Sequence, residues 1–166
     1  MLMISPAHSA RFGAPTRPVA SAGAWAHGDG VDPRAEILFY DGHCGMCHGF
    51  VRFLLARDRA RAFVFAPLQG ETFAATVPEA ERAKLPDSMM IRTADGRLLV
   101  RSAAALHVLD TVGGGWGTLA GLLRLVPRPL LDAAYRGVAA IRHRLGPTPP
   151  ATCPLVPADV RSRFAA

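Results

Sequence analysis

Two cysteines three residues apart, Cys44 and Cys47, are the residues of this chain best suited to do chemistry. They follow a short apolar run and open a stretch with apolar residues at helical spacing, which predicts that they start a helix. Backbone N–H groups and the helix dipole stabilise a thiolate there, and in such motifs the cysteine pKa falls from about 8.5 to roughly 3.5–7.5. We therefore expect Cys44 to attack a substrate disulfide. Cys47, one turn further in and expected to be less exposed, would resolve the mixed disulfide.

Asp41 stands three residues before Cys44, at the end of the apolar run. Its carboxylate could take the proton of Cys47 as that thiol attacks. It could equally cap the turn by accepting hydrogen bonds from backbone N–H groups. Both roles need only a carboxylate near the start of the helix, so the sequence leaves both open.

The residues that flank the cysteines are candidates for substrate contact. His43 and His48 lie beside the pair, and an imidazolium there would favour a thiolate; for His48 the simpler interpretation is a surface residue. Gly45 permits a tight loop and close approach of a substrate. We expect His43, Gly45 and Met46 to contact the substrate.

The elements that must position these residues follow an alternating pattern. Predicted strands and helices give the order β-α-β-α-β-β-α, a mixed sheet of thioredoxin topology over residues 34–115. An Asp95-Gly96 turn predicts the hairpin, and Ser102 is the expected N-cap of the last helix. The predicted strands are Glu36–Tyr40, Ala62–Pro67, Ser88–Arg92 and Arg97–Arg101; the predicted helices run from Met46 to near Asp58, through Gln69–Leu85 with a break at Pro78, and from Ser102 to Asp110, before the run of glycines at 113–115.

Residues 116–166 read as a helical extension that packs on this domain. Two amphipathic helices flank the hinge Pro127-Arg128-Pro129 and carry several arginines on their polar sides, Arg142 among them. Basic amphipathic helices also bind membrane surfaces, which is the alternative role. Residues 1–33 are rich in Pro and Gly without an apolar period, and are expected to be a disordered leader.

Composition excludes several classes of protein. The 166 residues carry 19 basic and 13 acidic side chains, a net charge of +6, and half the residues are hydrophobic, which fits one domain with a core. Dense basic runs with aromatics, which would favour nucleic-acid binding, are missing. The sequence shows neither a membrane-spanning apolar stretch nor a secretory signal, so we expect a cytoplasmic protein whose cysteine pair is not a structural disulfide.

The segment Asp41-Gly42-His43-Cys44-Gly45-Met46-Cys47 resembles the Asp-x-x-Cys-x-x-Cys signature of the DCC family, thiol–disulfide oxidoreductases with a thioredoxin-like fold. The resemblance implies redox activity of Cys44 and Cys47, a supporting role for Asp41, no bound cofactor, and protein or small-molecule thiols and disulfides as partners. It extends over about residues 37–164, through Asp87-Ser88-Met89, Arg101-Ser102, Val126-Pro127-Arg128-Pro129, Tyr135-Arg136, Cys153-Pro154 and Arg161–Phe164.

One departure from better-known thioredoxins concerns the loop before the third strand. Thioredoxins place a cis-proline there against the cysteines, where it helps to hold the substrate. Here Pro86 is separated from Ser88 by Asp87. Either Pro86 acts with a shifted register or Asp87 and Ser88 take its place, so all three are expected to bind substrate.

Three other functions compete with the redox interpretation. Cys44-Gly45-Met46-Cys47-His48 matches the attachment sequence of c-type haem. The two cysteines with Cys153 and a histidine could form a zinc site. Finally, the pair could be without redox function in an interaction protein; Cys153 alone is most simply a small buried apolar residue.

Overall fold

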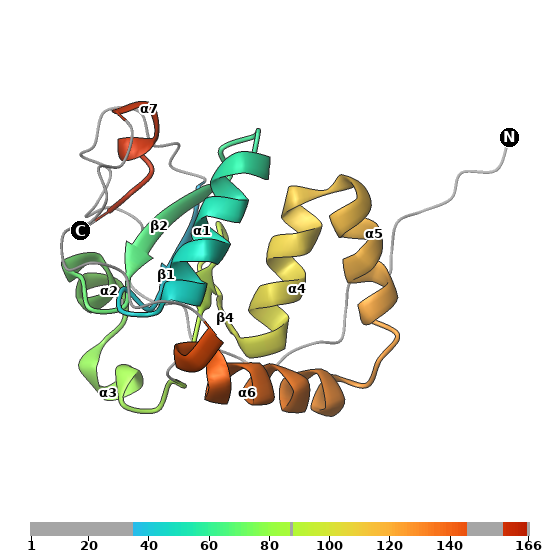
Figure 1. Ribbon diagram of the computed structural model, residues 1–166. Coiled ribbons are helices and arrows are strands. Elements are labelled where there is room, and N and C mark those ends of the chain that lie inside the picture. The colour runs from blue at the N-terminus through green and yellow to red at the C-terminus, as the bar shows by residue number, and fades with distance from the viewer. Residues whose placement is uncertain (1–34, 87, 146–157, 166) are drawn as a thin grey trace, which may run out of the picture.

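A mixed four-stranded sheet forms the centre of the protein, seen in a computed structural model that describes residues 35–86, 88–145 and 158–165 (Figure 1). The strand order is β2-β1-β3-β4. β1 pairs in parallel with β2 and antiparallel with β3, which pairs antiparallel with β4. The strands are β1 (Glu36–Tyr40), β2 (Phe63–Pro67), β3 (Met90–Arg92) and β4 (Leu98–Val100).

Helices cover both faces of the sheet. α1 and α4 lie on one face, and α6 runs across the ends of both and contacts them (Figure 1). The predicted thioredoxin-like α/β fold is confirmed, with the two short helices α2 and α3 on either side of the expected break at Pro78. The helices are α1 (Gly45–Arg57), α2 (Glu71–Thr76), α3 (Glu79–Arg82), α4 (Arg101–Val112), α5 (Gly114–Leu123), α6 (Arg128–Leu145) and α7 (Ala158–Arg161).

The alternation of side chains along β1 divides the core in two. Leu38 and Tyr40 point to the face under α1 and α4, where they pack with buried residues such as Leu54. Ile37 and Phe39 point to the opposite face, where the ring of Phe39 meets Phe73 of α2 edge-on at 5.0 Å. Because β1 is buried on both faces, it reads as a continuous apolar run in the sequence.

Two details of the helical half differ from expectation. Ser102 is not an N-cap: Val100 holds that position, and the buried Ser102 lies in the first turn of α4, where its hydroxyl donates to Asp132 of α6. The glycine run also does more than end α4. Gly113, with φ of 72°, caps α4, and α5 begins directly at Gly114.

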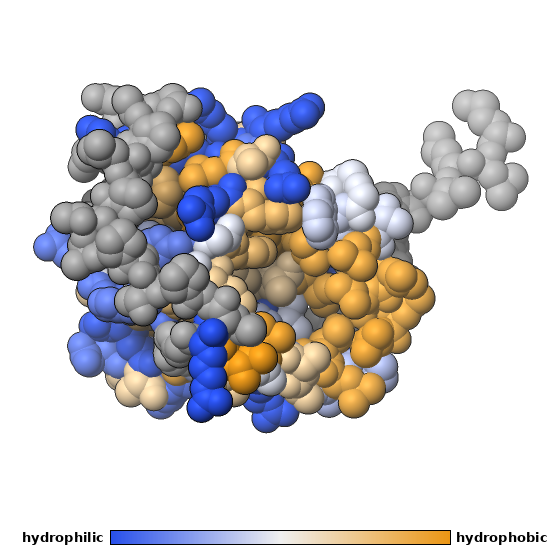
Figure 2. Space-filling model, viewed as in Figure 1, coloured by the Kyte–Doolittle hydropathy of each residue, from blue (hydrophilic) through white to orange (hydrophobic). Residues whose placement is uncertain are grey.

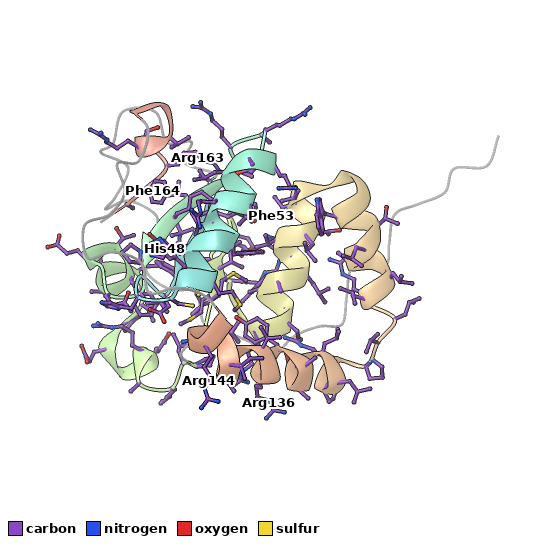
Figure 3. The ribbon with its side chains drawn as sticks, in the orientation of Figure 1. His48, Phe53, Arg136, Arg144, Arg163 and Phe164 are labelled. Carbon is purple, nitrogen blue, oxygen red and sulfur yellow. The ribbon has the colours of Figure 1, made fainter. Side chains whose placement is uncertain are left out.

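A short C-terminal segment lies along the free edge of β2. The Phe65 N–H donates to the Arg163 carbonyl at 2.8 Å, and the Ala165 N–H donates to the Phe65 carbonyl at 2.9 Å. The ring of Phe164 packs 5.5 Å from that of Phe65, beside β2 (Figure 3). The predicted leader and Cys153 lie outside the described residues.

An exposed apolar surface covers α5 and its turn into α6 (Figure 2). Leu125, in the turn, is 79% exposed. The ring of Trp116 in α5 packs edge-on against that of Phe53 at 4.9 Å. Within the described ranges no helix is both long enough and apolar enough to cross a membrane. Other exposed members of this surface are Leu119, Leu122, Val126 and Leu130.

Candidate active site

The turn from β1 into α1 brings the two cysteines together. Cys44 is the N-cap of α1, and its Sγ accepts a hydrogen bond from the Cys47 N–H at 3.4 Å. The Cys44 N–H donates to the Asp41 carbonyl at 3.2 Å, which closes the turn that precedes the helix. Both side chains are free thiols in this structure. The first cysteine therefore does what a serine or aspartate usually does at an N-cap, with sulfur as the acceptor.

The exposure of the two thiols is the reverse of the prediction. Cys44 is 1% exposed, whereas Cys47 is partly exposed and lines a cavity. Cys44 is the enclosed N-cap of α1, whereas Cys47, one turn along the helix, borders the cavity. Burial, reinforced by the Cys44 side chain, raises the pKa of Cys47 from 9.0 to about 12, against the opposing charge of Arg142. Cys47 is thus held as a neutral thiol at physiological pH.

The Asp41 carboxylate is buried and joins the turn to the last long helix. Its Oδ1 accepts from the His43 N–H at 2.9 Å and from Nε2 of Gln69 at 3.2 Å. Its Oδ2 lies 3.4 Å from Nη2 of Arg142, which belongs to α6 and is itself buried. Arg142 is therefore not the surface residue that the sequence suggested. The hydrogen bond to His43 is the capping interaction that was one of the two roles expected for Asp41.

Gln69 and His48 both hold the same turn through Gly42. The Gly42 N–H donates to Oε1 of Gln69 at 3.1 Å, and a Cβ at Gly42 would stand 3.2 Å from that oxygen, which is a tight contact. His48 is half-buried: its Nε2 lies 2.9 Å from the Gly42 carbonyl, and its ring meets Tyr40 edge-on. His48 is thus a structural partner of the turn rather than a simple surface residue (Figure 3).

A cavity of about 210 Å³ opens beside Cys47, where α1, α4 and α6 meet. Its wall is largely apolar, and the Asp41–Arg142 pair stands at one side; the surface is hollowed here in Figure 2. Burial raises the pKa of Tyr135, which also lines this cavity, while the neighbouring Ser88 and the backbone of Met89 act the other way. The remaining wall is formed by Tyr40, Met46, Phe50, Met89, Ala105, Val138 and Ala139.

Sequence comparison identifies the family. A sequence model described as DCC1-like thiol-disulfide oxidoreductase matches residues 38–147, from β1 to just beyond α6. The chain belongs to this family. That range contains Cys44, Cys47, Asp41 and Arg142, so the site described above lies wholly inside the family match.

Two relatives support the assignment to the DCC1-like family. The chain is 30% identical over 109 residues to "Uncharacterized protein YuxK" of Bacillus subtilis (strain 168), covering 66% of this chain and 79% of that protein. It is 27% identical over 114 residues to "DCC family protein At1g52590, chloroplastic" of Arabidopsis thaliana, covering 69% of this chain and 66% of that protein. No solved structure matches the chain significantly.

The residues expected to bind substrate in this DCC1-like protein occupy different surroundings. Met46 lines the cavity, whereas the His43 side chain is 78% exposed. Gly45 is the first residue of α1. Pro86 and Ser88 line a second hollow next to the cavity, and the peptide bond before Pro86 is trans. Asp87 lies outside the described residues.

Metal binding was an alternative for the same cysteines. In the part of the chain that the structure describes, no three His, Cys, Asp or Glu side chains are grouped as metal ligands would be. Cys153, which the zinc alternative needed, is not among those residues. For the haem alternative, the Nε2 atom of His48 is the natural iron ligand, and it is engaged with the Gly42 carbonyl.

Two residues of the site escaped sequence analysis, Gln69 and Arg142. Nothing in the sequence around Gln69 indicates that its amide reaches the turn before Cys44. Arg142 did leave a signal: Tyr135, Val138, Ala139 and Arg142 follow the spacing i, i+3, i+4, i+7 of one helix face. An arginine on the inward face of a helix needs a buried anionic partner, and Asp41 supplies it.

Proposed function

We propose that this protein catalyses thiol–disulfide exchange through the couple formed by Cys44 and Cys47. The observation that supports this most directly is the hydrogen bond from the Cys47 N–H to Cys44 Sγ at the N-terminus of α1. It holds the two side chains within one helical turn and gives the first sulfur a donor that favours a thiolate. Membership of the DCC1-like thiol-disulfide oxidoreductase family supports the same reaction class.

Ionisation and access favour different cysteines as the attacking group. Cys47 is the more accessible, but its pKa, raised to about 12, leaves it almost entirely un-ionised at pH 7. The Sγ of Cys44 accepts a hydrogen bond from the Cys47 N–H and lies at the N-terminus of a helix, and both features stabilise a thiolate. The loss of thiolate at Cys47 is the larger effect, so we assign the attack to Cys44 and the resolving step to Cys47.

The reaction then runs in two balanced steps. The Cys44 thiolate attacks a substrate disulfide; a mixed disulfide forms and one substrate sulfur leaves as a thiolate. Cys47 loses its proton and attacks Cys44 Sγ, which forms the Cys44–Cys47 disulfide and releases the second substrate thiolate. Two electrons pass from the protein to the substrate, and the reverse sequence oxidises a dithiol. Asp41 is a positioning residue that fixes the turn before Cys44 through His43 and Gln69.

The remaining predictions about the site and its partners fit this scheme. We propose that Met46 contacts the substrate in the cavity, that His43 and Gly45 contact it at the mouth of the turn, and that Pro86, Asp87 and Ser88 contact it from the loop before β3. Thiols or disulfides are the proposed partners. The cytoplasmic location and a contact of the α5–α6 surface with membranes stay predictions from the sequence.

Trapping experiments test the assignment. Cys47→Ser should accumulate a mixed disulfide with a substrate disulfide, detected as an added mass on the intact protein. Cys44→Ser should abolish turnover and accumulate no such adduct. If instead Cys44→Ser forms the adduct and Cys47→Ser does not, access rather than ionisation decides and the two roles are exchanged.

A titration of the wild-type pair in thiol–disulfide buffers, with alkylation and mass detection, should show one two-electron transition. A pair that stays reduced throughout contradicts the proposed function.

A further inference from the structure

A second hollow adjoins the cavity beside Cys47. It has a volume of about 340 Å³, and both hollows are lined by Tyr135, Ala139 and Arg142 of α6. Pro86 and Ser88 line it from the loop before β3. The two spaces therefore follow one another along the same helix, and a single elongated ligand would reach from one into the other.

The two hollows differ in chemical character. The cavity beside Cys47 is mostly walled by apolar side chains, whereas the second hollow is lined by Arg101 and Arg136. Neither of these two arginines forms an ion pair with a carboxylate of the described residues. The Nε of Arg136 donates a hydrogen bond to the Asp132 carbonyl, and the side chain projects from the outer side of α6 (Figure 3). Two guanidinium groups thus remain able to bind an anion.

Backbone strain also marks the second hollow as a candidate site. Arg101 has φ of 54°, a conformation that residues other than glycine rarely adopt and that tends to occur at functional sites.

We propose that the two hollows form one binding site for a small dithiol or cyclic disulfide with an apolar body and an anionic end. The apolar body lies in the cavity beside Cys47, with its sulfur atoms within reach of the Cys44–Cys47 couple, and the anionic group lies between Arg101 and Arg136. This inference rests on the proposed thiol–disulfide exchange and names the class of its substrate. A small molecule fits better than a polypeptide because the cavity lies between three helices and holds only about 210 Å³.

The reaction with such a dithiol is balanced without any further reagent. One ligand thiolate attacks Cys44 Sγ in the oxidised protein, so the Cys44–Cys47 bond breaks, a mixed disulfide forms and Cys47 leaves as a thiolate that takes up a proton. The second ligand thiol loses its proton and attacks the first ligand sulfur. A cyclic disulfide leaves, and both cysteines are reduced. Two electrons move from ligand to protein.

Dihydrolipoate and dihydrolipoamide are the probes that isolate the anionic end. They share the dithiol and the alkyl chain and differ only in a carboxylate against a carboxamide far from the sulfur atoms. Reduction of the oxidised wild-type protein is followed by alkylation and mass detection over a range of probe concentrations. The half-saturating concentration should be about tenfold lower for dihydrolipoate, since charge-assisted hydrogen bonds to guanidinium favour the carboxylate.

Three variants give the test its controls. Arg136→Gln and Arg101→Gln should each raise the half-saturating concentration of dihydrolipoate more than that of dihydrolipoamide, and so reduce the preference for dihydrolipoate. Arg144→Gln removes an exposed arginine of the same helix that lines neither hollow, and it should retain the preference (Figure 3). A wild-type protein that reacts equally with both probes, or a preference that survives both substitutions, overturns the inference. The proposed function fails separately if neither probe nor dithiothreitol reduces a Cys44–Cys47 disulfide.

Discussion

Each end of α1 is tied to a distant arginine through a buried aspartate. At the N-terminal end Asp41 meets Arg142, and at the C-terminal end Asp58 meets Arg163. The partners are 101 and 105 residues apart in the sequence, and all four side chains are at most 8% exposed. The two pairs thus use the same groups on the same helix, yet their surroundings differ.

The Asp58–Arg163 pair is surrounded by backbone. Asp58 is the C-cap of α1 and accepts from the N–H groups of Ala62 and Phe63 at 3.0 and 3.1 Å. Arg163 donates to Asp58 and twice to the Phe63 carbonyl, and its guanidinium lies over the ring of Phe65. Burial lowers the pKa of Arg163, and Asp58 opposes that shift. All these contacts join α1, β2 and the C-terminal segment, so this pair is structural.

The Asp41–Arg142 pair is looser and borders a cavity. Its ion-pair distance is 3.4 Å, and both residues line the space into which Cys47 faces. Its charge also acts on chemistry, because Arg142 opposes the high pKa of Cys47. The comparison shows that burial of an ion pair does not by itself indicate function. What distinguishes the two pairs is a reactive group and open space beside one of them.

The largest effect is expected at the structural pair. Arg163→Met should reduce the free energy of unfolding by about 3–5 kcal/mol, because it leaves the Asp58 carboxylate buried without its charge partner. Exchange activity per folded molecule should be unchanged. Urea denaturation and initial rates measure the two quantities, with the exposed Arg161→Met as the matched control. A variant as stable as the control would show that the pair contributes no stability.

The second prediction concerns pH, which should affect only the end of α1 that carries the thiols. The pKa of Cys47 is raised to about 12, so its thiolate fraction increases about tenfold per pH unit from pH 7 to 9. Decay of a mixed disulfide on Cys44 should accelerate in proportion. Single-turnover kinetics across that range provide the measurement. A rate independent of pH would mean that a local base, with Asp41 as the candidate, already removes the proton.

Removal of Arg142 should change the chemistry as well as the stability, because the ion pair with the buried Asp41 is lost too. In Arg142→Met the positive charge near Cys47 is lost, its pKa rises further, and resolution of the mixed disulfide should slow about tenfold. Arg142→Lys restores a charge without the planar guanidinium and should recover part of the rate. Arg144→Met is the control from the same helix. If Arg142→Met resolves mixed disulfides at the wild-type rate, the charge of Arg142 does not influence Cys47.

The two ends of α1 also show what the sequence could and could not predict. Glu36–Tyr40 was predicted to the residue as a strand, and α1 ends at the expected place, because apolar spacing and capping are local properties. The position of Cys44 and Cys47 at the helix start followed from the same local pattern. These features need no knowledge of which distant segment packs on them.

Contacts made by distant segments were the part that failed. Ser102 was predicted as an N-cap because serine often holds that position. The local sequence could not show that its hydroxyl instead donates to Asp132 of the distant helix α6. The order of exposure of Cys44 and Cys47 was wrong for the same reason, since it depends on how the turn packs and where α6 leaves a cavity. Arg142 was wrongly predicted to lie on the polar side of its helix, because its buried partner Asp41 comes from the distant turn after β1.

The smallest effect is expected at Gln69, the third side chain at the functional end. Its amide oxygen accepts a hydrogen bond from the Gly42 N–H, and its amide nitrogen donates one to Asp41. Gln69→Leu should therefore lower the free energy of unfolding by about 1 kcal/mol, a small effect because the site is partly exposed. Gln69→Glu keeps the size and the acceptor but replaces the donor with a second carboxylate facing Asp41. It should therefore be less stable than Gln69→Leu at pH 7, and the difference should shrink as the pH falls and the new carboxyl is protonated. Urea denaturation at pH 7 and pH 5 compares the two variants. Equal stability at both values would show that Gln69 does not donate to Asp41, leaving Arg142 as the link from Asp41 to the rest of the fold.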